Sequence, residues 1–218
     1  HEAYEAALGG WIERLMGRGG GRFLDDFEPL ARDAAALGAQ NSLSQTLLKL
    51  TCPGVPDIYQ GCEREYFALV DPDNRAPLDP RSLSSDRPSA KLDLTRRLLA
   101  LRRREPELFS TGSYEPLAVE GPAQDSLLAF ARRQGPAVLV VIVPRFPGRR
   151  LGVASVPEFW RDTWVEWPAG AAPEDFADAL TGAQPRVEAG EGRLRLHAAT
   201  LPAAFPGAAF AAPREAAA

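Results

Sequence analysis

The periodicity of the apolar residues changes once along this chain of 218 residues, and that change constrains the fold more than any other feature of the sequence. Before about residue 106, leucines recur at the three-to-four spacing of amphipathic helices. From Ser113 onward, short β-type runs such as AVLVVIV and DTWVEW follow one another between Gly and Pro turns. The sequence therefore predicts two parts, residues 1–110 and residues 111–218, with the boundary near residues 109–112.

The first part is predicted to alternate helices with one strand. Helices are expected at about residues 2–16, from about residue 25 to 50, and from about residue 89 to 105, where Pro106 follows. Between the last two helices, the run LTCPGVPDIYQGCE (residues 50–63) is apolar enough to be a buried strand, and a polar loop rich in Pro and Asp follows it. This succession is typical of a parallel α/β architecture, such as the last units of a (β/α)8 barrel of the TIM type.

The second part is predicted to be an antiparallel β-sandwich, because its short strands recur at intervals of eight to twenty residues. Its aromatic residues have two readings. Trp160, Trp164 and Trp167 are either part of the core, which is the commoner role for tryptophans in a β domain, or a platform on which sugar rings stack. The pattern leaves both readings open.

Composition and charge exclude several classes of partner. The net charge of −4 opposes binding to nucleic acid or to an anionic membrane surface, and the arginines of RRLLALRRRE are expected to form the solvated face of a helix. No apolar run reaches the roughly 20 residues that span a bilayer, and the first residues lack a signal peptide. A cytoplasmic protein is expected. Because the chain begins with His1 in a sequence of helical character, we expect a fragment of a longer protein.

Metal and redox chemistry are not expected. Cys52 and Cys62 are the only cysteines, and the extended run between them would hold them too far apart for a disulfide. The two histidines, His1 and His197, lie at opposite ends of the sequence. No metal site, no cofactor and no Cys-His nucleophile is therefore predicted.

Polar residues at the end of an apolar strand point to a site. In a (β/α)8 barrel the chemistry lies where the strands end, which would place Gln60, Gly61 and Glu63 at the active face. The run also resembles the eighth barrel strand of the α-amylase superfamily, glycoside hydrolase family 13, whose Gly-x-Pro-x-x-Tyr-x-Gly-x-Glu pattern is matched here by the residues Gly54, Pro56, Tyr59, Gly61 and Glu63.

Further blocks narrow the resemblance to the maltooligosyl trehalose synthases of that family. They are NSLSQTLLKLTCPGVPDIYQG, ALVDPDNRAPLD, FWRDTWVEWP, DALTG and LPAAFP, which together cover most of the chain. The resemblance implies the C-terminal part of an intramolecular transglycosylase. Such an enzyme converts the α-1,4 linkage at the reducing end of a maltooligosaccharide into an α,α-1,1 linkage with retention, using two carboxylates about 5 to 5.5 Å apart.

The resemblance also implies which residues this chain does and does not supply. The family takes its catalytic carboxylates from barrel strands four, five and seven, and none of those motifs occurs here, so no catalytic residue is assigned and a missing N-terminal part of the same enzyme becomes the expected partner. A maltooligosaccharide is the expected substrate. The residues expected to contact it through hydroxyl-binding groups are Tyr59, Gln60, Glu63, Asp73, Asn74 and Arg75.

Structural roles compete with these assignments. Asp57 is expected to be a paired structural carboxylate, Tyr59 has equal reason to pack, and the DPDNR sequence forms a turn whether or not it binds sugar. Two other functions stay open for the chain: a non-catalytic glucan-binding or interaction module, and part of an amylolytic or trehalose-releasing hydrolase of family 13.

Overall fold

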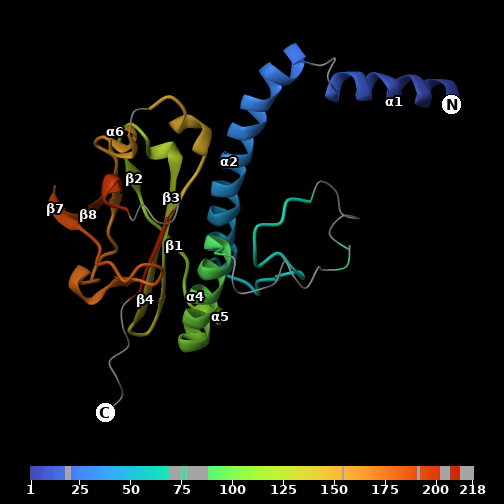
Figure 1. The fold of residues 1–218 in the computed structure, drawn as a ribbon. Coiled ribbons are helices and arrows are strands. Elements are labelled where there is room, and N and C mark those ends of the chain that lie inside the picture. The colour runs from blue at the N-terminus through green and yellow to red at the C-terminus, as the bar shows by residue number, and fades with distance from the viewer. Residues whose placement is uncertain are drawn as a thin grey trace. The chain divides into compact units, whose positions relative to one another are not determined.

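The computed structural model describes residues 1–17, 21–68, 75, 77, 88–153, 155–190, 192–201 and 207–211 (Figure 1). The chain divides into two compact units, residues 1–39 and residues 40–218. The boundary predicted from the sequence lies at residue 110, between the helical part and the β part of the chain, and is not the boundary between these two units. It stays a prediction.

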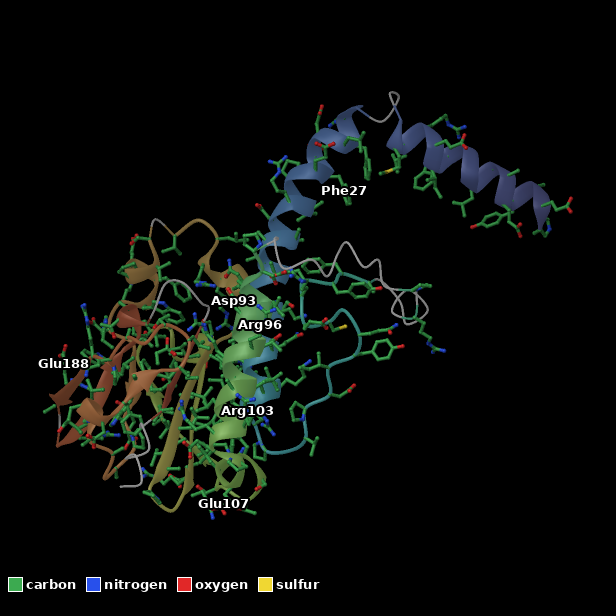
Figure 2. All side chains as sticks on the ribbon, turned by 60° about the horizontal axis from the view of Figure 1, so that its bottom comes forward. Phe27, Asp93, Arg96, Arg103, Glu107 and Glu188 are labelled. Carbon is green, nitrogen blue, oxygen red and sulfur yellow. The ribbon has the colours of Figure 1, made fainter. Side chains whose placement is uncertain are left out.

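Nearly all of the described residues of the first unit are helical. This unit holds α1 (Glu2–Met16) and the first part of α2 (Gly21–Thr51), and α1 has no buried residue. The rings of Phe23 and Phe27 stack with their centroids 5.2 Å apart on α2, and Figure 2 shows Phe27 on that helix. The helices expected from the leucine spacing are therefore present, although α2 begins a few residues earlier than predicted.

Three helical segments of the second unit form one layer. They are the end of α2, α4 (Ala90–Arg104) and the short α5 (Pro106–Ser110). The Ser89 side chain caps α4 by accepting a hydrogen bond from the Leu92 amide at 3.1 Å. Pro106 separates α4 from α5 because it has no amide hydrogen to continue the first helix. Leucines on one face of α4 are buried, namely Leu94, Leu98 and Leu101.

The first sheet has five antiparallel strands in the order β1-β3-β4-β9-β6. Its centre is a hairpin of two long strands, which turns at Gly135 with a φ of 55°. The strands are β1 (Glu115–Pro116), β3 (Leu127–Gln134), β4 (Ala137–Pro144), β6 (Ala177–Asp178) and β9 (Ala208–Ala211).

The second sheet has four antiparallel strands in the order β2-β5-β8-β7. They are β2 (Val119–Glu120), β5 (Trp164–Glu166), β7 (Val187–Gly190) and β8 (Arg193–His197). A short helix, α6 (Val156–Trp160), precedes β5. Short 3-10 turns form some of the connections, namely Gln124–Ser126, Pro147–Arg150, Pro173–Asp175 and Ala198–Thr200.

The first sheet lies between the helices and the second sheet, so both of its faces are buried. Alternate residues of β4 show this directly: Leu139, Val141 and Val143 join the core cluster of the helices, whereas Val140 and Ile142 join the cluster of the second sheet. The three layers are visible in Figure 1, with the end of α2 and α4 beside β3 and β4. The predicted antiparallel β region is confirmed.

The predicted strand at residues 50–63 is wrong for this structure. Helix α2 continues through Thr51, and the residues from 52 to 68 form bends and turns without any strand. Val55, expected inside a barrel, is 97% exposed. A strand needs a neighbouring strand for its amides and carbonyls, and none adjoins this run in the described part of the chain. The predicted barrel units are therefore not confirmed.

Candidate functional site

A loop that leaves the end of α2 carries most of the candidate site. This loop, residues 52–68, runs along the side of α2 and α4 that faces away from the two sheets (Figures 1 and 2). It contains a tight turn in which the Cys62 amide donates to the Tyr59 carbonyl at 2.9 Å. Gly61 lies buried inside that turn with a φ of 84°, a conformation that favours glycine. The turn therefore projects its polar side chains to the outside.

The structure brings together three of the six predicted site residues. Tyr59, Gln60 and Glu63 share the turn, with Tyr59 and Gln60 exposed and Glu63 half-buried. Arg75 is an exposed turn residue. Asp73 and Asn74 lie outside the described residues.

The expectations for structural roles have mixed outcomes. Tyr59 is 48% exposed, so packing does not account for the whole of its side chain. The exposure of Asp57 contradicts its predicted role as a buried structural carboxylate, because the strand that would have buried it is not formed.

The far end of the loop is attached to the beginning of α4. The Glu65 carboxylate accepts a hydrogen bond from the Ser89 hydroxyl at 2.8 Å and from the Lys91 amide at 3.3 Å. Partial burial pushes the pKa of Glu65 upward, but these hydrogen bonds and the Lys91 charge outweigh it and hold the pKa below its usual value. Glu65 is thus an ionised carboxylate fixed at the first turn of a helix, where negative charge is favourable.

A small group of charged side chains surrounds this attachment. Burial lowers the pKa of Lys91, which also interacts electrostatically with Cys62, Lys49, Glu65 and Glu63. Sequence analysis missed Lys91 and Glu65, because nothing in their spacing indicates that residues 26 positions apart would meet. Carboxylates, an ammonium group and an amide side chain are the groups that bind sugar hydroxyls.

Arg102 attaches the near end of the loop. Its guanidinium donates to the Leu50 carbonyl at 2.9 Å and to the Gly54 carbonyl at 3.2 Å, and it lies over the Phe109 ring at 4.6 Å. The prediction that the arginines of this helix form a solvated face is therefore wrong for Arg102. It holds for Arg96 and Arg103, which are exposed and marked on α4 in Figure 2.

The tryptophans of the β region divide between the two predicted roles. Trp160 and Trp167 are each 2% exposed, which confirms them as core residues. Trp164 is half-buried, with the Arg195 guanidinium 4.5 Å from its ring centroid and His197 packed against it edge-on. A platform of three tryptophans is therefore excluded, and Trp164 alone keeps a partly open ring.

The described residues hold no group of three or more His, Cys, Asp or Glu side chains arranged to bind a metal ion. Cys52 and Cys62 are free and half-buried. Burial raises the pKa of the Cys52 thiol, against the opposing charge of Arg132. No helix in the described part of the chain is both long and apolar enough to cross a bilayer.

Comparison with known proteins finds relatives in the family that the run at residues 50–63 and the other quoted sequence blocks resemble. A Mycobacterium tuberculosis protein that carries the provisional name maltooligosyl trehalose synthase is 34% identical over 185 residues, which is 84% of this chain and 22% of that protein. A variant of the maltooligosyltrehalose synthase from Arthrobacter ramosus is 32% identical with a TM-score of 0.64, over 85% of this chain and 24% of that one. The chain is a relative of the maltooligosyl trehalose synthases. No protein-family model matches it.

The relationship to maltooligosyl trehalose synthases confirms the resemblance derived from the sequence, and it is limited in extent. The chain spans only 22% of the length of the curated relatives that it matches. An Anoxybacillus α-amylase, 18% identical with a TM-score of 0.54 over 81% of this chain, shares the fold over that region. The fold of this chain therefore occurs in maltooligosyl trehalose synthases and in α-amylases.

Proposed function

We propose that this chain is the C-terminal portion of an enzyme that rearranges the reducing end of a maltooligosaccharide, converting its last α-1,4 linkage into an α,α-1,1 linkage. The observation that carries the proposal is the 34% identity over 84% of the chain to proteins named for that synthase. The chain would contribute a wall of the sugar site through Tyr59, Gln60 and Glu63, which are presented on one turn. Arg75, with Asp73 and Asn74, would extend that wall.

The catalytic carboxylates belong, on this proposal, to the part of the enzyme that precedes this chain. The mechanism retains configuration and needs a nucleophilic carboxylate and an acid/base carboxylate on either side of the scissile bond. It must also hold the released glucose in place and exclude water, so that the anomeric hydroxyl of that glucose attacks the glycosyl-enzyme. A rigid, hydroxyl-binding wall serves that requirement.

The test is an assay of maltopentaose with the whole reading frame that contains this chain, following reducing ends and free glucose together. Loss of reducing ends with little glucose release is the expected result. Release of glucose would instead favour an amylolytic hydrolase.

A glucan-binding module is the second candidate, because Trp164 keeps a partly open ring beside Arg195. It would be supported by maltooligosaccharide binding that Trp164→Ala abolishes, without any turnover. Trp160 cannot contribute to such binding, since its ring is in the core.

A further inference from the structure

The last carbonyls of α2 are satisfied by two arginines from other elements. A helix leaves its final four carbonyls without partners inside the helix. Here Leu50 accepts from Arg102 of α4 at 2.9 Å, and Thr51 accepts from Arg132 of β3 at 3.3 Å. Two positive charges at the negative end of the helix dipole stabilise the point at which the loop begins.

Arg102 does more than cap the helix. Its second terminal nitrogen donates to the Gly54 carbonyl at 3.2 Å, so one guanidinium joins the last turn of α2 to the third residue of the loop. Gly54 has a φ of 120°, a conformation that other residues adopt only with strain. Because the guanidinium is a planar fork and rests on the Phe109 ring at 4.6 Å, it fixes the direction in which the chain leaves the helix.

The same helix holds both ends of the loop. Arg102 binds residue 54, and Ser89 and Lys91 bind Glu65 at the other end of α4. At 1.5 Å per residue, the helix from position 89 to 102 measures about 20 Å, whereas the loop from 54 to 65 would reach about 36 Å if extended. The loop is therefore longer than the distance between its two attachment points. The turn at residues 59–63 lies in the part of the loop between them.

We propose that Arg102 is a positioning residue for the glucan-contacting turn at residues 59–63, and that α4 is the rigid support to which both ends of the loop are attached. The sugar part of this inference rests on the proposed function. Arg102 does not touch the substrate. It acts through the backbone of Leu50 and Gly54.

Hydrogen exchange of the 218-residue chain tests the structural part. Arg102→Gln removes the cation, Arg102→Lys keeps it but replaces the planar fork, and Arg103→Gln is the matched control one position along the same helix. In both Arg102 variants we expect exchange of the hydrogen-bonded amides of Cys52 and Cys62 to accelerate about tenfold or more, while exchange in β4 stays unchanged. Unchanged exchange in the loop, or equal acceleration in the Arg103 control, would overturn the inference.

Steady-state kinetics with maltopentaose, on the whole reading frame, test the functional part. We expect Arg102→Lys to raise KM about tenfold with kcat within about threefold, because a loosened wall weakens sugar binding more than it alters the distant carboxylates. Faster loop exchange with unchanged KM would overturn the positioning role. If the wild-type enzyme converts no maltopentaose, the proposed function and the sugar part fail together, while the exchange experiment still decides whether Arg102 holds the turn.

Discussion

Single side chains connect the layers of this protein, and Arg132 is the largest fully buried side chain among the described residues. It is 1% exposed, and its guanidinium donates to the carbonyls of Thr51, Phe109, Gly112 and Ser113. Burial lowers its pKa below the ordinary value for a guanidinium, against the opposing interaction with Cys52. These hydrogen bonds join the end of α2, the end of α5 and strand β3 at one point, so the side chain determines how the helices rest on the sheet.

Replacing Arg132 should destabilise the protein strongly. In Arg132→Met, the carbonyls of Thr51, Phe109, Gly112 and Ser113 lose their donor inside the protein, so we expect a loss of about 3 kcal/mol or more in the free energy of unfolding. Urea denaturation measures it. Arg133→Gln is the control, because Arg133 forms a surface ion pair with Glu115 at 3.0 Å and should cost less than about 1 kcal/mol. Similar losses in the two variants would contradict this account of Arg132.

Glu65 should make loop attachment sensitive to acid. Its pKa in the folded protein lies below the usual 4.5, so the stability it contributes is present above about pH 4.5 and is lost as the pH falls through the lower, folded value. We expect Glu65→Gln to cost less than about 1 kcal/mol at pH 7, since the side chain is exposed and screened. The difference from wild type should shrink in urea titrations at pH 4 and pH 3. A difference that is the same at all pH values would contradict the role of the ionised carboxylate.

At the scale of elements, tight connections between strands carry strict steric requirements. Gly121 follows β2 with a φ of 113°, and a Cβ placed there would meet the Asp162 carbonyl oxygen at 2.2 Å. Gly135, in the β3-β4 hairpin, has a φ of 55° but open space around it. Replacing each glycine by alanine therefore distinguishes the loss of stability caused by backbone strain from the loss caused by a steric collision.

Gly121→Ala should therefore be far more damaging than Gly135→Ala. We expect about 1 kcal/mol for Gly135→Ala, from strain alone, and about 3 kcal/mol or more for Gly121→Ala, where the backbone of residues 162 and 163 must also move. Thermal or urea unfolding of both variants provides the measurement. Equal losses of stability in the two variants would show that the backbone after β2 moves to accommodate the new side chain at little cost.

Elements whose character depends on local pattern were predictable from the sequence. The leucine spacing of α4 and the continuous apolar run of β4 follow directly from which faces are buried, one face of the helix and both faces of the strand. The run at residues 50–63 was not predictable in this way, because a short apolar run has the same composition whether it pairs with other strands or leaves a helix as a loop. The partners of Arg102, Glu65 and Lys91 lie 24 to 52 positions away along the chain, where no spacing rule applies.

At the scale of the whole molecule, the first sheet of the second unit contributes side chains to two hydrophobic cores, one on each of its faces. Phe130, Leu139 and Val141 pack with the leucines of α4, while the opposite face packs on the second sheet. The helices and the β region therefore bury one another's apolar surface. Residues 1–39 form a compact unit separate from this arrangement.

Two truncations should behave differently for this reason. The chain of residues 40–218 should unfold cooperatively within a few degrees of the same transition in the 218-residue chain, because its two cores are complete. The chain of residues 111–218 should bind a hydrophobic dye and aggregate, because one face of the central sheet loses its cover. Calorimetry and light scattering distinguish the two. A soluble, cooperative fragment of residues 111–218 would support the predicted boundary at residue 110.

The position of α4 between the sheet and the loop has a consequence for how such a sequence can diverge. Substitutions on the outer face of the second sheet are two layers away from residues 59–63, so they can accumulate without reaching the loop. Substitutions on the buried face of α4 displace the loop's two anchor points, at Gly54 and Glu65, even though they lie far from any sugar. We therefore expect variation among descendants of this sequence to be graded by layer, greatest on the outer sheet and least along α4.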